Sequence, residues 1–356
     1  MAWLEPGQPV RTWLSWAAFL YGLIVRLRHW CYRRGWCAAS RLPCRVVSVG
    51  NVTVGGTGKT PVVILLTEWL LAEGRRVAVL SRGYKRESGS PHCLVSDGVR
   101  LLADPSDSGD EPFLIARRCP TAIVAVGADR AALGRWVLAQ HPVDCMILDD
   151  GFQHLALSRD VDLVLVDATD APGLDAMVPA GRLREPLTGL GRAEALVITR
   201  ADCKEDVDAV CRRLQAAHLS SDDAIQVRFM SESLIAVSAQ AMQPLEWCRG
   251  MKAWLVSGIG NSESFRRSVA SLGVEIIGET AFSDHHRYHD GDVRRVRADA
   301  QTAAADIVLT TEKDAGKLYP FLTPADSWWA LRIRAEIIRG EERLRGLVMD
   351  RGTSRA

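Results

Sequence analysis

The strongest chemical signal in the 356-residue sequence is a glycine-rich segment followed by lysine and threonine. Residues 53–60 read TVGGTGKT and match the phosphate-loop pattern G-x-x-x-x-G-K-[ST] except at the first position. Glycines let backbone N–H groups turn toward phosphate oxygens, and a following helix adds its positive N-terminal end. The segment therefore predicts a nucleotide phosphate site. Its residues are Thr53, Val54, Gly55, Gly56, Thr57, Gly58, Lys59 and Thr60.

Two side chains of this loop have predicted roles. Lys59 is expected to contact the β- and γ-phosphates of ATP, and the Thr60 hydroxyl is expected to bind Mg²⁺. A chance G-K-T sequence in a loop is the alternative. An apolar run at 45–50 predicts a strand before the loop, and the periodicity of 61–72 predicts a helix after it. This order favours nucleotide binding.

Paired acids follow another apolar run. Asp149 and Asp150 end the segment ILDDG, which reads as a strand entering a turn. Because the carboxyl ends of parallel strands line the ligand crevice, one of these acids is predicted to hold Mg²⁺ or its waters. A solvated Asp-Gly turn is the alternative.

A second acidic turn and a histidine cluster are less specific. The segment SGDEP at 108–112 is typical of a helix start, with Asp110 as the cap. The segment 282–289 holds three of the eight histidines. No cysteine or further histidine stands at a spacing that favours zinc, and a histidine beside a carboxylate could instead accept a proton from a hydroxyl. The spacing alone does not choose between these uses.

The elements that must position these residues alternate along the chain. Short β-branched runs separated by helical segments predict an α/β fold with a doubly wound, mostly parallel, phosphate-loop NTPase-like sheet. A second alternating block predicts a smaller α/β domain, with connecting segments near 230–238 and 240–244. We expect an N-terminal region at 1–44, a kinase-type domain at 45–230 and a smaller domain at 231–356. The predicted strands are 45–50, 76–80, 122–126, 145–148, 161–166, 195–198, 253–256, 274–277, 306–309 and 328–333.

The N-terminal region contains a run without charge, 12–25, followed by several arginines. It is shorter than the roughly 20 apolar residues that span a bilayer. The segment could also be a secretory signal peptide, but export would separate the phosphate loop from the cytosolic ATP that it needs. A second alternative is an ordinary helix that packs against the core of the protein. The coincidence of Trp13, Trp16 and Tyr21 with basic flanks favours a helix lying in the membrane interface.

Composition adds limits. The formal net charge is +1, so bulk charge gives no indication of nucleic-acid binding. None of the nine cysteines forms a C-x-x-C pair, so the sequence gives no support for a zinc ribbon or a redox motif. This number of free thiols is typical of a protein in a reducing cytosol.

Eight motifs in order resemble those of the tetraacyldisaccharide 4'-kinase family, and the resemblance covers nearly the whole chain. The same family departs from the strict loop pattern at the Thr53 position. The motifs are GNVTVGGTGKTP, SRGY, SGDEP, LDDGFQH, PAGRLREP, SGIGN, FSDHHRY and TTEKD.

The resemblance implies an enzyme of lipid A biosynthesis. Such a kinase moves the γ-phosphate of ATP to the 4'-hydroxyl of tetraacyldisaccharide 1-phosphate, which gives lipid IVA. ATP and Mg²⁺ are the implied cofactors. The implied location is the cytoplasmic face of the bacterial inner membrane, peripheral or monotopic, with the lipid and the membrane surface as partners and no nucleic acid.

The resemblance also carries site residues. Asp110 and His285 match a pair thought to activate the sugar hydroxyl, and Lys59 completes the catalytic set. Metal candidates are Thr60, Asp149, Asp150 and Glu111. Candidates for contacts with the lipid substrate are Arg82, Tyr84, Arg130, Gln153 and His154.

Two other functions use the same features. A GTP- or ATP-driven switch or a metal-insertion chaperone would share the phosphate loop, and 199–202 (TRAD) vaguely resembles a guanine-reading element. Its lysine is replaced, however, and Asp149-Asp150-Gly151 lacks D-x-x-G spacing. A membrane scaffold would leave the loop and the acids without a use.

Overall fold

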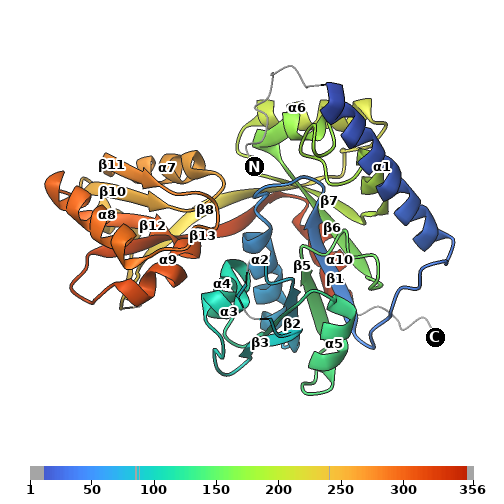
Figure 1. Ribbon diagram of the computed structural model, residues 1–356, viewed down its shortest axis with the longest axis horizontal. Helices are drawn as coiled ribbons and strands as arrows, with labels where there is room; N and C mark the ends of the chain where they lie inside the picture. The colour runs from blue at the N-terminus through green and yellow to red at the C-terminus, as the bar shows by residue number, and fades with distance from the viewer. Residues whose placement is uncertain (1–11, 85, 88, 240, 351–356) are drawn as a thin grey trace.

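Two lobes of unequal size share one continuous sheet (Figure 1). The computed structural model describes residues 12–84, 86–87, 89–239 and 241–350. Thirteen strands in these residues belong to the sheet, in the order β11-β10-β12-β13-β8-β7-β6-β1-β5-β2-β4-β3, with β9 paired to β8. The strands are β1 (Arg45–Asn51), β2 (Val77–Ser81), β3 (His92–Asp97), β4 (Ile123–Gly127), β5 (Cys145–Asp149), β6 (Val161–Asp167), β7 (Ala195–Thr199), β8 (Ile225–Ala236), β9 (Met242–Gln243), β10 (Lys252–Ser257), β11 (Glu275–Ala281), β12 (Ile307–Thr311) and β13 (Trp328–Arg339).

The large lobe is a parallel sheet covered on both faces. Its strands β4, β2, β5, β1, β6 and β7 run parallel, and β3 closes the edge in antiparallel orientation. These strands are apolar on both sides because helices bury both faces. One face packs against α2, α4 and α10, and the other against α5 and α6. The helices of this lobe are α2 (Lys59–Ala72), α3 (Pro105–Ser108), α4 (Asp110–Arg118), α5 (Arg130–Leu138), α6 (Lys204–Ala216) and α10 (Glu341–Met349).

The small lobe repeats the pattern with fewer elements. Strands β11, β10, β12 and the first part of β13 are parallel. Every strand predicted from the sequence begins within one residue of its predicted start, in both lobes. The helices here are α7 (Ser262–Ala270), α8 (Asp290–Thr302) and α9 (Glu312–Leu318).

The two lobes are joined by β8 and β13, which pair in antiparallel orientation almost along their whole length. The predicted connector at 230–238 is thus mostly strand, and the predicted boundary at 230/231 falls inside β8. Helix α10 differs from the predicted division, since it returns to the large lobe. There Leu344 and Val348 are fully buried in the core that contains β1 and α2. The wide apolar face of the large sheet explains this return.

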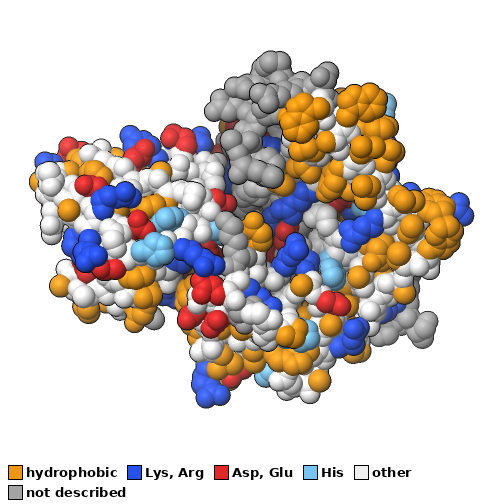
Figure 2. All heavy atoms as spheres, in the orientation of Figure 1, with side chains coloured by type: hydrophobic (Ala, Val, Ile, Leu, Met, Phe, Trp, Pro, Cys, Tyr) orange, Lys and Arg blue, Asp and Glu red, His pale blue; other side chains and the backbone are white. Residues whose placement is uncertain are grey.

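Helix α1 (Thr12–Arg33) lies against the large lobe with an apolar face left outside. Residues 1–11 of the predicted N-terminal region lie outside the described residues. Figure 2 shows hydrophobic side chains gathered over α1. No helix in the described part of the chain is long and apolar enough to cross a bilayer. Six large apolar side chains of α1 are more than half exposed: Trp13, Trp16, Phe19, Leu20, Ile24 and Leu27.

Candidate active site

The predicted phosphate loop connects β1 to α2, as the sequence indicates. Donors from elsewhere in the large lobe bind three of the loop's carbonyl groups, and the Val54 N–H donates to the Arg182 carbonyl at 2.8 Å. These contacts fix the backbone path of the loop, whose later N–H groups are predicted to bind the phosphates. Helix α2 begins at Lys59 without a side-chain cap and has no acid in its first turn, so its positive end is also available. The contacts are Arg182 Nη2 to Val54 O (3.0 Å), Arg200 Nη1 to Gly56 O (3.2 Å) and Thr199 Oγ1 to Thr57 O (2.9 Å).

Glycine is required at two loop positions. Gly58 has φ +77°, and a Cβ there would meet the Phe229 ring at 2.2 Å. Gly55 has φ +114°, and a Cβ there would meet Arg182 at 2.4 Å. Both backbone conformations disfavour other residues, so these glycines set the path of the loop.

Lys59 is already held near an acid. Its Nζ lies 3.4 Å from Asp150, which Arg184 also binds at 2.8 Å. Burial by itself raises the pKa of Asp150, but Lys59 and Arg184 outweigh burial and lower this pKa to about 2. Asp150 therefore holds the Lys59 side chain in position at the start of α2.

Asp149 has the opposite environment. It is 5% exposed, and Oδ2 accepts a hydrogen bond from Ser81 Oγ at 3.0 Å. Burial, and then the charges of Asp150 and Glu111, raise its pKa to about 6. Negative charge thus accumulates beside the phosphate loop, where a cation would be favourable.

The structure brings together the two halves of the predicted Asp–His pair. Asp110 is the first residue of α4 in the large lobe, and His285 lies in the loop after β11 in the small lobe. His285 Nδ1 is 3.1 Å from Asp110 Oδ2. The Asp110 side chain makes no capping bond to α4, so the helix-cap interpretation is wrong.

Charges from the small lobe surround this pair. Lys317 Nζ is 3.1 Å from Asp110 Oδ2, and Lys313 Nζ is 2.8 Å from Glu111. Burial by itself raises the pKa of Asp110, but the His285 hydrogen bond and then Lys317 lower it below its ordinary value. Asp110 is therefore ionised at neutral pH.

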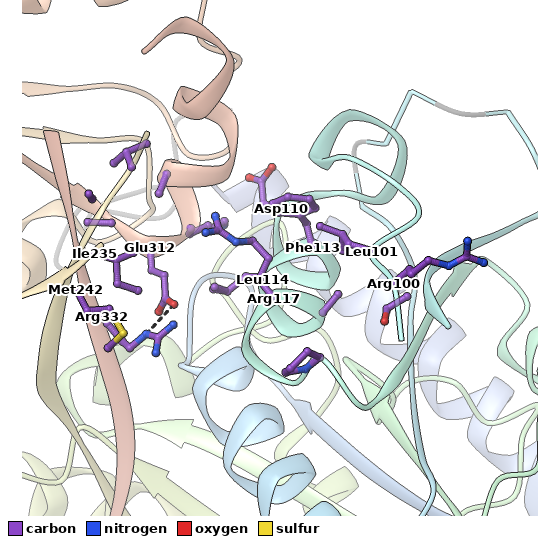
Figure 3. Close-up of a pocket in the computed structure, with 18 of the residues that line it drawn as sticks. Arg100, Leu101, Asp110, Phe113, Leu114, Arg117, Ile235, Met242, Glu312 and Arg332 are labelled. Carbon is purple, nitrogen blue, oxygen red and sulfur yellow. Dashed lines mark hydrogen bonds and ion pairs between the residues drawn. The ribbon is translucent and has the colours of Figure 1, made fainter. Parts of the chain in front are cut away.

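A cleft of about 320 Å³ between the lobes opens beside Asp110. Figure 3 shows Phe113, Leu114 and Arg117 of α4 on one side, and the Glu312–Arg332 ion pair on the other. Side chains of both lobes therefore line the space next to the predicted pair.

Three of the predicted substrate residues, Arg82, Arg130 and His154, form a basic corner. Arg130 is 7% exposed, and its Nε is among the buried polar atoms that lack a partner in the described residues. Burial and then the charge of Arg82 lower the pKa of Arg130. His154 Nε2 also lacks a partner there, and burial together with Arg130 lowers the pKa of His154 to about 4. This arrangement suits an anion.

The other two substrate candidates have different surroundings. The Tyr84 ring meets the His285 ring edge to face at 5.3 Å between centroids, beside the predicted pair. Gln153 instead supports the protein, because its Nε2 donates to Asn51 O at 2.8 Å and to Glu185 at 2.7 Å.

Sequence reasoning missed the roles of several residues in motifs that it had noted. The PAGRLREP motif supplies Arg182 and Arg184, which hold the phosphate loop and Asp150. The TTEKD motif supplies Lys313, and Lys317 follows one turn after Lys313. The two arginines lie more than 120 residues from the phosphate loop in the sequence, so their motif alone did not indicate this contact.

A strand–loop–helix unit with lysine at the helix start, inside a mostly parallel sheet, defines a phosphate-loop nucleotide-binding protein. Comparison with known proteins narrows this class. A family model described as "Tetraacyldisaccharide-1-P 4'-kinase" (LpxK) matches residues 10–352. The chain belongs to this family.

Relatives agree along most of the chain. A tetraacyldisaccharide 4'-kinase of Anaeromyxobacter sp. (strain Fw109-5) is 39% identical over 88% of this chain and 84% of its own length. That of Syntrophus aciditrophicus (strain SB) is 39% identical over 89% of this chain and 88% of its own length. A crystal structure of LpxK from Aquifex aeolicus in complex with ATP matches with a TM-score of 0.73 and 31% identity, covering 94% of this chain and 96% of the other. The chain is a lipid kinase, and the switch or chaperone alternative is not favoured.

Proposed function

We propose that the chain transfers the γ-phosphate of ATP to the 4'-hydroxyl of tetraacyldisaccharide 1-phosphate, forming lipid IVA, and that Asp110 and His285 activate this hydroxyl. The observation that supports this assignment is the 3.1 Å contact between His285 Nδ1 and Asp110 Oδ2. It connects the two lobes and links residues that are 175 positions apart in the sequence.

The geometry suggests which oxygen of Asp110 acts. Oδ2 is engaged by both His285 and Lys317, whereas Oδ1 has no hydrogen-bond partner among the described residues. Oδ1 accepts the hydroxyl proton as the sugar oxygen forms a bond to the γ-phosphorus. The bond from this phosphorus to the bridging oxygen breaks, and ADP leaves. His285 fixes the orientation of the carboxylate.

Phosphoryl transfer depends mainly on positioning and charge stabilisation. The N–H groups at the C-terminal end of the loop and the Lys59 ammonium would supply both to the β- and γ-phosphates. We therefore expect the contribution of Lys59 to exceed that of the Asp–His pair.

Mg²⁺ fits the residues beside the loop. No group of three or more His, Cys, Asp or Glu in the described chain converges on a metal, which agrees with an ion held largely by phosphates and water. Thr60 and Asp149 would hold it, with Asp150 close by and Glu111 engaged by Lys313. When bound, Mg²⁺ neutralises charge on the transferred phosphate.

The lipid has two expected contacts. The basic corner of Arg130, Arg82 and His154 suits the 1-phosphate, because arginine binds phosphate with paired hydrogen bonds. The exposed apolar face of α1 suits the membrane interface, with its arginines on anionic lipid on the cytoplasmic side.

A single assay tests the reaction. Purified protein is incubated with Mg-ATP and tetraacyldisaccharide 1-phosphate in detergent micelles, and the lipids are separated by thin-layer chromatography. A doubly phosphorylated lipid is the expected product, and its absence would overturn the function. Asp110→Asn tests the residue assignment separately, because full activity in this variant would remove the pair from the mechanism.

A further inference from the structure

A buried acid of the TTEKD motif connects the loops that surround the Asp–His pair. Asp314 is fully buried in the first turn of α9. Its Oδ2 accepts hydrogen bonds from Thr311 Oγ1 at 2.7 Å and from the Gly258 backbone N–H at 2.9 Å. Its Oδ1 lies 3.0 Å from Lys317 Nζ. Asp314 therefore has one oxygen on the SGIGN loop and the other on a lysine.

Each of these two contacts of Asp314 leads on to the Asp110–His285 pair, one through Gly258 and the other through Lys317. In the first, the Gly258 carbonyl accepts a hydrogen bond from the His285 backbone N–H at 3.1 Å. His285 has φ +60°, a left-handed conformation that costs a non-glycine residue on the order of 1 kcal/mol or more. This conformation needs support from its surroundings, and the Gly258 turn, anchored by Asp314, supplies it.

The second branch runs through Lys317. Its side chain is 10% exposed, and its ammonium lies between Asp314 Oδ1 and Asp110 Oδ2, at 3.0 and 3.1 Å. It also lies 5.4 Å from the centre of the Tyr288 ring. A buried cation with two carboxylate partners has little freedom to move, because losing either partner would leave a charge uncompensated. Lys317 therefore fixes the rotamer of Asp110 from the opposite lobe.

We propose that Lys317 and Asp314 are positioning residues for phosphoryl transfer. Lys317 occupies Asp110 Oδ2 so that Oδ1 is left for the sugar hydroxyl, and Asp314 holds both Lys317 and the loop that presents His285. This inference rests on the proposed role of the Asp110–His285 pair.

A purely structural role for Lys317 would predict different kinetics. If the ion pair only stabilised the contact between the lobes, its loss would lower the free energy of unfolding. Any effect of this loss on kcat would then be independent of the effect of Asp110→Asn. A residue that acts through Asp110 should change kcat and should lose its effect once Asp110 no longer works as a carboxylate.

The experiment is a double-mutant cycle on the full-length kinase with its lipid and Mg-ATP. The variants are Lys317→Ala, Asp110→Asn and the combination, with Lys252→Ala as the control, because Lys252 is an exposed lysine of the same lobe. We expect Lys317→Ala to lower kcat about 10- to 100-fold with little change in the KM for ATP. In the Asp110→Asn background the same change should cost less than about threefold. Lys252→Ala should match the wild type.

Two further variants keep the test decisive if Lys317→Ala unfolds. Lys317→Arg retains the cation and should recover most of kcat, and Asp314→Asn retains the shape while weakening both branches. Circular dichroism and ATP binding at the large lobe establish that each variant is folded.

The outcomes separate this inference from the proposed function. Full activity in Asp110→Asn would overturn the role of the pair and the inference with it. A large loss in Asp110→Asn with no loss in Lys317→Ala, or with independent losses that multiply in the double variant, would overturn the inference alone.

Discussion

Asp149 and Asp150 are adjacent in sequence, yet their surroundings predict opposite effects on stability. Replacing Asp149 by asparagine should stabilise the nucleotide-free protein at neutral pH. Its pKa rises from an ordinary 3.8 to about 6 on folding, so the folded protein binds a proton more tightly than the unfolded chain does. Ionisation therefore destabilises the folded state, fully above about pH 6 and hardly below about pH 4.

The size of the effect follows from this difference in pKa. About two pKa units at roughly 1.4 kcal/mol each give a penalty of about 3 kcal/mol near pH 8. Part of that penalty, about 1 kcal/mol, is already present at pH 4.5. The free energy of unfolding of Asp149→Asn, minus that of the wild type, should thus rise by about 2 kcal/mol between pH 4.5 and 8. The loss of the Ser81 hydrogen bond adds an offset that does not depend on pH.

Urea unfolding in EDTA measures this difference, because EDTA removes divalent cations that would compensate the carboxylate. Asp150→Asn is the matched control. The pKa of Asp150 is lowered on folding, so its ionised form stabilises the protein above about pH 4, and the variant should be less stable at pH 8. Asp150 is 35% exposed, and water therefore screens part of its effect. A difference for Asp149→Asn that stays flat or falls as the pH rises would refute the reasoning.

Three other predictions concern the loop and the helix. Gly58→Ala should weaken ATP binding at least tenfold, measured by calorimetry, since φ +77° and the Phe229 ring both oppose a Cβ; unchanged affinity would contradict the loop geometry. Arg184→Ala should lower kcat about tenfold by loosening Asp150 and Lys59, whereas the same change at Arg213, in a surface ion pair, should have no effect. Ile24→Glu should reduce sedimentation with anionic vesicles, because Ile24 is 66% exposed on α1; normal sedimentation would argue against the interfacial helix.

The sequence predicted the parts of the molecule that depend on neighbours in the chain. The strand at 45–50, the glycine loop and the helix after it form one local unit, and all three are found. The parallel strands of the large lobe were predicted because burial on both faces makes them almost wholly apolar. The antiparallel edge strand β3, whose outer positions are only partly buried, was not predicted. The second half of strand β8, from Met230 on, was predicted as part of a connector instead. This strand lies in a two-stranded ribbon between the lobes, and its polar residues, such as Arg228 and Glu232, carry no strong strand signal.

The arrangement of the site was only partly accessible from the sequence. The contact between Asp110 and His285 spans two lobes, so no local pattern encodes it, and only the family resemblance predicted it. The roles of Arg182 and Arg184 depend on how their segment folds back over the end of β1, where Arg184 N–H donates to the Val52 carbonyl at 2.7 Å. Such long-range contacts follow from the packing of the whole chain.

The way in which α1 is attached matters for anyone who prepares this kinase for inhibitor screening. Its outer face invites removal, since a protein without it should be easier to handle in aqueous buffer. Its inner face, however, donates hydrogen bonds from Tyr21 to the Arg184 carbonyl at 2.9 Å and from Arg28 to the Gln153 carbonyl at 3.1 Å. His29 covers the fully buried Glu185 at 3.4 Å. A truncated reagent would lose these contacts with Arg184, Gln153 and Glu185, and Arg184 is the residue that binds Asp150 beside Lys59. Compounds ranked on such a reagent would therefore be ranked against an altered site.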